Sequence, residues 1–218
     1  GWRGRWANTL RLWSAKAQRE FDLEPFNRGD HIAAAVPSVL AETISRVLYP
    51  DDTTEQGKLL RLKQEYFFTA ASLADILRRY LAQNDDVTRL PQTIAIQLND
   101  THPAIAFPEL IRLLVDLHGQ SFADAFEIAR NCLHYTNHTL LPEALERWPV
   151  DLMGRVLPRH LQLIEQIDSH HANLVKRPAG VKIIDGGEVR MGDDLLGTVA
   201  RAADDRNANA ALQVKDSV

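Results

Sequence analysis

Cysteine is nearly absent from this chain of 218 residues, which contains only Cys132. A single cysteine excludes a disulfide within the chain and a multi-cysteine zinc or iron–sulfur centre, so we expect a reducing, cytoplasmic location. Long apolar runs are absent as well, because Pro37 and charged residues interrupt each of them well before the roughly 18 residues of a membrane span. The chain also opens without a signal-peptide pattern. We therefore expect no membrane partner.

An excess of positive charge is also lacking, since 25 Lys and Arg residues face 29 Asp and Glu residues, for a net charge of −4. Such a balance gives no general attraction for nucleic acid, so an anionic ligand would need a local site. Neither a glycine-rich phosphate loop nor a serine nucleophile elbow is present. The apolar fraction of 45% and the charged fraction of 25% are ordinary for a folded globular chain.

Apolar periodicity predicts the secondary structure. Spacings of three and four predict helices over 27–49, 58–81, 108–117, 121–130 and 155–176, the first with one buried face and with a kink or restart at Pro37. Short apolar segments predict a mostly buried strand over 93–98 and a hairpin over 181–191; the segment 131–136 is a second strand candidate that could instead continue the preceding helix. We divide the chain into an α/β domain over 1–177 and a hairpin with a divergent tail over 178–218.

Two polar clusters follow the predicted strands, Asn99 to His102 and Asn137 to Thr139. A strand–helix–helix–strand connection is normally a right-handed crossover between parallel strands, which would bring both clusters to one sheet edge. Short polar side chains of this kind bind the hydroxyl groups of sugars. The alternative is that Asp100 and His138 only satisfy backbone groups in turns, and spacing alone favours that alternative.

Other polar residues have simpler interpretations. His134 and His138 have the spacing of metal ligands on a helix, but a metalloprotease glutamate and a third ligand are missing, so no metal site is predicted. Glu143 and Glu146 could form a glycosidase-like carboxylate pair, although a structural ion-pair network beside Arg147 is the simpler interpretation.

The polar clusters belong to a series of ordered motifs that resembles the α-1,4-glucan phosphorylases, the glycogen, starch and maltodextrin phosphorylases. The strongest are IQLNDTHP at 96–103 and YTNHTLLPEALERWP at 135–149; further matches lie at 8–16, 46–50, 57–58, 61–67, 75–79 and 157–161. The resemblance covers roughly 8–191 and fades after Pro178.

The resemblance implies an enzyme that uses inorganic phosphate to release glucose 1-phosphate from the end of an α-1,4-glucan. It implies a helix-rich, Rossmann-like part of the N-terminal half of a two-domain, GT-B type glycosyltransferase. His138 resembles the catalytic histidine, which contacts the sugar's 6-hydroxyl and whose carbonyl faces the developing positive charge. Asp100, His102, Asn137 and Thr139 resemble substrate-binding residues.

The segment from Asp51 to Gly57 resembles a gating loop, with Asp52 and Thr53 within it, and Arg78-Arg79 resembles an effector-phosphate contact of regulated, allosteric members. Family members carry pyridoxal 5'-phosphate on a lysine of their C-terminal domain, and that lysine has no counterpart in this chain. We therefore expect a fragment, a split protein or a frameshifted product that is inactive alone, and a homodimer for the full-length enzyme.

Two further functions stay open at the level of the sequence. The chain could be a non-catalytic carbohydrate-binding or interaction domain derived from a phosphorylase, since the cofactor lysine is missing. It could also be a plain α/β structural domain whose polar turns take part in no chemistry.

Overall fold

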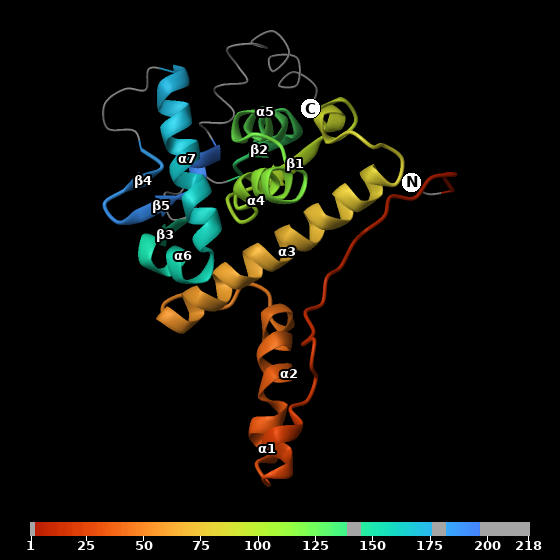
Figure 1. Cartoon of the computed structure of the whole chain (residues 1–218), viewed down its shortest axis with the longest axis vertical. Helices are drawn as coiled ribbons and strands as arrows, with labels where there is room; N and C mark the ends of the chain where they lie inside the picture. Colours follow the sequence, from red (N-terminus) through yellow and green to blue (C-terminus); the bar gives the residue numbers. More distant parts are fainter. Residues whose placement is uncertain (1–2, 139–144, 176–181, 197–218) are drawn as a thin grey trace. The chain divides into compact units, whose positions relative to one another are not determined.

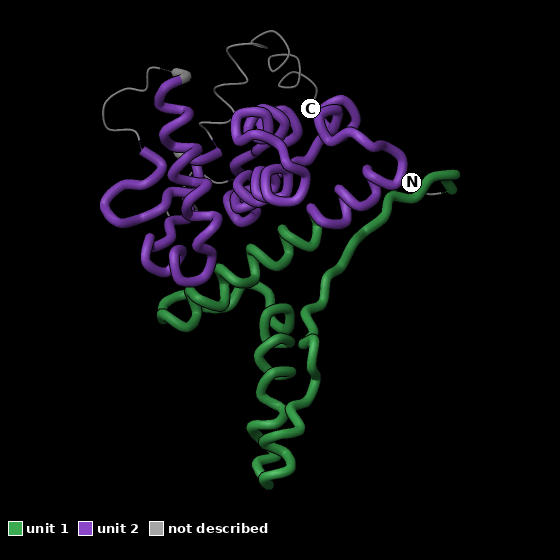
Figure 2. Tube along the Cα trace, in the orientation of Figure 1, with its two compact units in different colours: residues 1–72 green, residues 73–218 purple. Residues whose placement is uncertain are grey.

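A computed structural model describes residues 3–138, 145–175 and 182–196. The chain is a helix-rich α/β protein that divides into two compact units, Gly1–Ser72 and Leu73–Val218 (Figure 2). Within the described ranges, none of the helices combines the length and the apolar character needed to cross a membrane.

Unit 1 contains the helices α1 (Leu23–Asn27) and α2 (His31–Arg46) and the first part of α3 (Glu55–Leu81) (Figure 1). Asp22 and Asp30 cap α1 and α2, because their carboxylates accept hydrogen bonds from the backbone N–H groups of Glu24 and Ala33. The preceding extended segment lies along α2, where the N–H of Ala15 donates to Ser45 Oγ at 2.9 Å. Unit 1 is thus an extended segment beside two capped helices.

The predicted helix over 27–49 is present as α2 with closer bounds, 31–46, but the expectation that one of its faces is buried is wrong. Gly29 has φ +86°, a conformation that ends α1 and separates it from α2, and α2 then continues through Pro37 without restarting. Only Ala34 of α2 is buried, whereas Ile32 is 84% exposed. Periodicity shows that a helix has an apolar face but not whether another element covers it.

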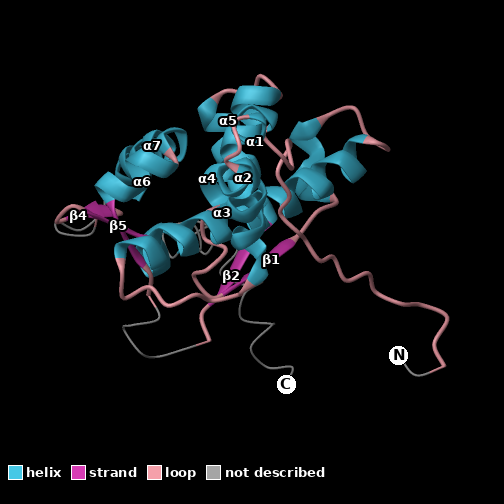
Figure 3. Cartoon of the chain, turned by 90° about the horizontal axis from the view of Figure 1, so that it is seen from below, coloured by secondary structure: helices cyan, strands magenta, loops and turns pink. Residues whose placement is uncertain are grey.

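Unit 2 contains the rest of α3 and two small sheets with their helices (Figure 3). The elements that follow α3 are the 3₁₀ helix η1 (Val87–Gln92), β1 (Ile96–Asn99), α4 (Ala106–Arg112) with the helical turns η2 (Leu113–Leu117), α5 (Phe122–Cys132), β2 (Leu133–Thr136), β3 (Arg147–Pro149), α6 (Val150–Val156), α7 (Pro158–Val175), β4 (Ile184–Asp185), β5 (Glu188–Arg190) and the helical turns η4 (Met191–Leu196).

The first sheet confirms the predicted parallel crossover. Strands β1 and β2 pair in parallel from Ile96↔Leu133 to Asn99↔Thr136, with α4 and α5 between them in the sequence (Figure 3). Ser121 caps α5, as its hydroxyl accepts from the N–H of Asp124, and Gly119 makes the preceding turn with φ +66°. The carboxyl ends of the two strands therefore meet at one edge.

Helices α4, α5 and α7 enclose the core of unit 2 (Figure 1). The rings of Phe107 on α4 and Phe126 on α5 pack edge to face with centroids 5.5 Å apart. The other fully buried large side chains of these helices and η2 are Leu110, Ile111, Leu114, Leu163, Ile164 and Ile167. Helix α5 also contacts strand β2, so this core adjoins the parallel strands.

A buried charged cluster connects α4 to α7. Glu109 is 1% exposed, and its Oε2 lies 2.6 Å from Nε2 of His160, which is 3% exposed. Arg112 donates to both carboxylate oxygens of Glu109, at 2.7 and 2.9 Å. Burial alone would raise the pKa of Glu109, but the hydrogen bonds from Arg112 and His160 outweigh it and hold that pKa below its ordinary value.

The second sheet has the order β3-β5-β4 and contains the predicted hairpin, with β4 and β5 antiparallel. The predicted helix over 155–176 is wrong at its start, because two helices, α6 and α7, meet at Leu157. Leu157 precedes Pro158 and adopts φ −133°, ψ 58°, since the proline ring disfavours a helical conformation in the residue before it.

Candidate functional site

The ends of β1 and β2 are joined by Asp100. Its carboxylate Oδ1 accepts a hydrogen bond from the backbone N–H of His138 at 2.8 Å, and its own N–H donates to the carbonyl of Thr136 at 2.9 Å. Asp100 and His138 are 38 positions apart, so only the parallel pairing of the strands brings them together. The predicted juxtaposition of the two polar clusters is present in unit 2.

The side chain of His138 lies beside the same strand end. Its Nε2 is 3.4 Å from Oδ1 of Asn99, the last residue of β1, and both residues are exposed. Asn137 precedes His138 and is exposed as well. Thr139 lies outside the described residues. The imidazole and the neighbouring amides therefore form an open polar edge that could donate and accept hydrogen bonds to a hydroxyl-rich ligand.

His102 follows in the turn after β1 and contacts Glu146. Its Nδ1 lies 2.9 Å from Oε1 of Glu146, whose side chain is 8% exposed. We expected a structural ion-pair network of Glu143 and Glu146 beside Arg147; Glu146 contacts His102, and Arg147 pairs with Glu188 at 3.7 Å. Glu146 is buried just before strand β3, whereas Arg147, the first residue of β3, is exposed. Glu143 lies outside the described residues.

The candidate gating loop belongs to unit 1 and is tied to the start of α3. Asp52 Oδ2 pairs with Arg61 at 2.7 Å, and the Arg61 guanidinium lies 4.3 Å from the centre of the Tyr49 ring. Thr53 donates its N–H to Asp51 at 2.8 Å, and the hydrogen bonds from Thr53 hold the pKa of Asp51 below its ordinary value. The loop is thus ordered by named contacts within its own unit.

Three other candidates from the sequence have contacts or positions that explain them without a ligand. Arg78 and Arg79 both pair with Asp75, at 2.7 and 3.3 Å. His134 lies on strand β2, so the helical spacing of metal ligands does not apply to it and His138. Cys132 is buried, and burial raises its pKa to about 12, which makes the thiol unreactive.

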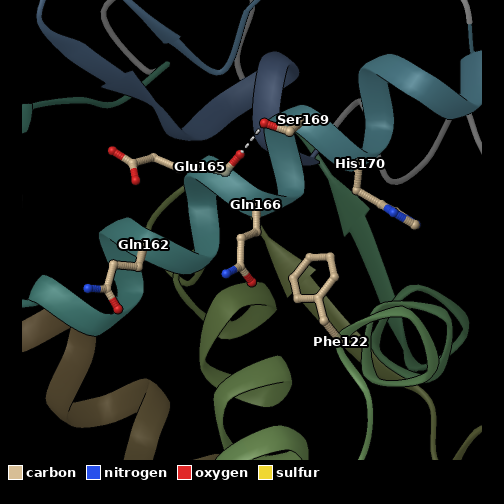
Figure 4. A pocket seen from close by; sticks show the side chains of 6 residues that line it. All are labelled: Phe122, Gln162, Glu165, Gln166, Ser169 and His170. Carbon is tan, nitrogen blue, oxygen red and sulfur yellow. Dashed lines mark hydrogen bonds between the residues drawn. The ribbon is translucent and has the colours of Figure 1, made fainter.

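A separate surface hollow of about 500 Å³ lies between the start of α5 and α7 (Figure 4). Phe122 supplies an aromatic wall, and the other lining residues come from α7: Gln162, Glu165, Gln166, Ser169 and His170. The Ser169 hydroxyl donates to the backbone carbonyl of Glu165 at 3.0 Å. None of the predicted site residues lines this hollow.

Sequence reasoning identified the two strand ends and also offered the alternative that Asp100 satisfies backbone groups, as it does by accepting from the His138 N–H. It missed the contact between His102 and Glu146, which are 44 positions apart.

Comparison with known proteins gives consistent matches. Residues 1–193 match the carbohydrate phosphorylase family model. The liver form of glycogen phosphorylase from Homo sapiens is 51% identical over 183 residues, which are 80% of this chain and 22% of the relative. The liver form from Ovis aries is 52% identical over 176 residues, 77% of this chain and 21% of the relative. Glycogen phosphorylase from Haemophilus influenzae is 51% identical over 176 residues, 81% of this chain and 21% of the relative.

This chain therefore spans about a fifth of the length of the curated relatives it matches. The family model extends over nearly all of the two units described above and includes both strand ends and the loop before α3. The chain belongs to the carbohydrate phosphorylase family.

Proposed function

We propose that this chain supplies the glucosyl-binding wall of an α-1,4-glucan phosphorylase. The observation that carries the proposal is the hydrogen bond between Asp100 and the His138 backbone at the carboxyl ends of parallel strands, the place where open α/β sheets bind ligands. Support comes from family membership and from relatives named glycogen phosphorylase.

In the proposed reaction, the bond between C1 of the terminal glucose and the glucan oxygen breaks, and a phosphate oxygen forms a new bond to C1. A proton from phosphate goes to the departing glucan oxygen, so the products are glucose 1-phosphate and a glucan shortened by one unit. Positive charge develops at C1 as the first bond breaks. A dipole fixed beside C1 stabilises that charge only while it forms, which lowers the barrier.

His138 is the residue to which we assign this role. Its imidazole would bind the sugar's 6-hydroxyl, and its backbone carbonyl would face C1. Asp100, His102, Asn137 and Thr139 would line the same pocket. The exposed positions of Asn137 and His138 at the strand end are consistent with contact to a ligand.

We extend the proposal to the architecture of the whole protein. The parallel pair β1-β2 would belong to the Rossmann-like N-terminal half of a two-domain GT-B type enzyme, and a homodimer would be its assembly. The loop with Asp52 and Thr53 would gate access to the site, and its ion pair with Arg61 would hold one position of the gate.

The pyridoxal 5'-phosphate of glucan phosphorylases does not fit the residues of this chain that the structure describes. The described lysines are Lys16, Lys58, Lys63 and Lys182; none of them is buried, and none is among the site residues above. A lysine that holds a reactive cofactor needs a cleft that excludes water. We therefore propose that residues outside this chain hold the cofactor.

The test uses the complete polypeptide that contains this chain, with maltoheptaose and inorganic phosphate. Formation of glucose 1-phosphate is expected. His138→Ala should lower kcat/KM by about 2- to 13-fold, because it removes the imidazole's hydrogen bond to the 6-hydroxyl, worth about 0.5–1.5 kcal/mol, and keeps the backbone carbonyl. His134→Ala removes an exposed imidazole from strand β2 and should leave kcat/KM near its original value.

Maltoheptaose binding without glucose 1-phosphate would overturn the proposal and indicate a carbohydrate-binding protein that has lost the reaction. An unchanged rate in His138→Ala would remove His138 from the site.

A further inference from the structure

Asp100 has an uncommon backbone conformation. Its φ is +59°, which lies in the left-handed region, and steric contacts there destabilise residues other than glycine by about 1–2 kcal/mol. Asp and Asn tolerate this region better than other side chains because they form local hydrogen bonds there. A conformation of this cost persists when surrounding contacts hold it.

The contacts that hold Asp100 both reach the end of strand β2. Its N–H donates to the carbonyl of Thr136, and its carboxylate accepts from the N–H of His138. The strand ladder ends at the pair Asn99↔Thr136, so His138 lies beyond it. The Asp100 side chain therefore contacts the His138 backbone beyond the last pair of the strand ladder.

The imidazole of His138 lies beside the turn that follows β1, with its Nε2 3.4 Å from Oδ1 of Asn99. Residues 99 and 100 thus contact both the backbone and the imidazole of His138. A carboxylate that accepts from a backbone N–H forms a charge-assisted hydrogen bond, which is stronger than a neutral one. The consequence is an exposed histidine whose orientation is held from the neighbouring strand.

We infer that Asp100 is a positioning residue, whose carboxylate holds the backbone of His138, and through the backbone its carbonyl and imidazole, in the orientation that glucosyl transfer needs. The inference rests on the proposed function for its catalytic meaning, and it gives Asp100 a different role from that of a residue that binds the sugar directly. Catalysis is sensitive to such placement, since a displacement of 1 Å can cost about 100-fold in rate.

Variants of Asp100 separate the hydrogen bond from the backbone conformation. Asp100→Gly permits the same φ and removes the acceptor, whereas Asp100→Asn keeps both an acceptor oxygen and tolerance of positive φ. Asp85→Gly makes the same chemical change in an exposed bend and serves as the control.

Hydrogen exchange of the His138 amide, measured by NMR on the 218-residue chain, reports the bond without any catalysis. Exchange should become about 10- to 100-fold faster in Asp100→Gly, the factor expected for a lost hydrogen bond to a charged group. It should rise less in Asp100→Asn, which keeps a neutral acceptor, and should change less than about threefold in the Asp85→Gly control. The amide of Ala125, bonded to the Ser121 carbonyl at 2.9 Å, shows that the variants stay folded.

A measurement on the unmodified chain covers the case in which Asp100→Gly does not fold. The amide proton shift of His138 and the carboxyl carbon shift of Asp100 are followed through an acid titration. If the two groups are bonded, both shifts change with the same midpoint. An amide of His138 that does not respond to the Asp100 carboxyl would overturn the inference.

The catalytic part uses the complete polypeptide with maltoheptaose and phosphate. We expect kcat to fall at least about tenfold in Asp100→Gly, to fall far less in Asp100→Asn and to stay near its original value in Asp85→Gly, with KM for phosphate little changed. If Asp100→Gly had the kcat of the unmodified polypeptide although its His138 amide exchanged rapidly, the positioning role would be overturned. Loss of kcat in Asp100→Asn with slow exchange would overturn it as well, in favour of direct contact between the carboxylate and the reacting groups.

The two proposals fail in different ways. If exchange at His138 responds as expected but the unmodified polypeptide makes no glucose 1-phosphate, the proposed function fails while the hydrogen bond stands. If exchange does not respond while the unmodified polypeptide is active, the positioning role fails and the proposed function stands.

Discussion

The buried carboxylate of Glu109 offers a sharp test of how unit 2 is held together. Glu109 on α4 meets Arg112 through two hydrogen bonds and His160 on α7 through one contact at 2.6 Å. We consider Glu109→Gln, which keeps the size of the side chain and removes its charge. The amide oxygen of the glutamine can still accept a hydrogen bond. Its amide nitrogen is a donor that faces the donor groups of the cluster, so it forms no hydrogen bond in place of the one lost.

The expected loss follows from these contacts. Each hydrogen bond to a charged group contributes about 1.5–3 kcal/mol, and the substitution makes all three bonds neutral on the acceptor side and removes at least one of them. The side chain of Arg112 is 23% exposed, so water can hydrogen-bond to its guanidinium in the variant and offset part of the lost free energy. The remainder is about 3 kcal/mol of unfolding free energy, near the lower end of what a broken buried ion pair costs.

Urea denaturation at pH 7, followed by circular dichroism, measures the unfolding free energy. Glu165→Gln on the exposed side of α7 makes the same chemical change without a buried partner and should stay within about 0.5 kcal/mol of the unmodified chain. If Glu109→Gln were no less stable than this control, the cluster would not contribute to the packing of α4 against α7.

The stability that the Glu109 carboxylate contributes should depend on pH. The pKa of Glu109 is lower in the folded chain than its ordinary value of 4.5, so the carboxylate contributes stability above that pH and loses it as the pH falls through the folded value. The difference between the unmodified chain and Glu109→Gln should therefore be present at pH 7 and shrink below about 4.5. A difference that grew toward acid pH would refute this reasoning.

Three further predictions concern the loop before α3 and the lone thiol. A Cβ at position 57 would lie 1.9 Å from the carbonyl oxygen of Asp51, so Gly57→Ala should cost about 1–3 kcal/mol of unfolding free energy, and an unchanged Tm would contradict it. Arg61→Ala removes the ion pair to Asp52 and should speed proteolysis within 51–57, whereas Lys63→Ala, on the exposed side of α3, should not. Cys132 should resist iodoacetamide at pH 8 until urea unfolds the chain, and rapid labelling of the native protein would show that the thiol is accessible.

Much of the secondary structure could be predicted because its causes are local. Spacings of three and four residues identified α3 and α5, and two apolar segments identified the parallel strands β1 and β2. The crossover between them follows from a general rule of chain handedness, so the meeting of Asp100 and His138 at one edge could be expected. Helix boundaries failed where single residues decide them, at Gly29 and Leu157.

The sequence alone indicated the family, through its ordered motifs, and placed the candidate residues at two strand ends. Both the motifs and the strands depend on residues that are neighbours along the chain. Only the tertiary structure decides that His102 meets Glu146, that Glu109 meets His160, and that the apolar side chains of α2 stay exposed. The first two of these outcomes depend on which side chains pack together across 44 and 51 positions. Periodicity along one element contains no information about the partner that will face it.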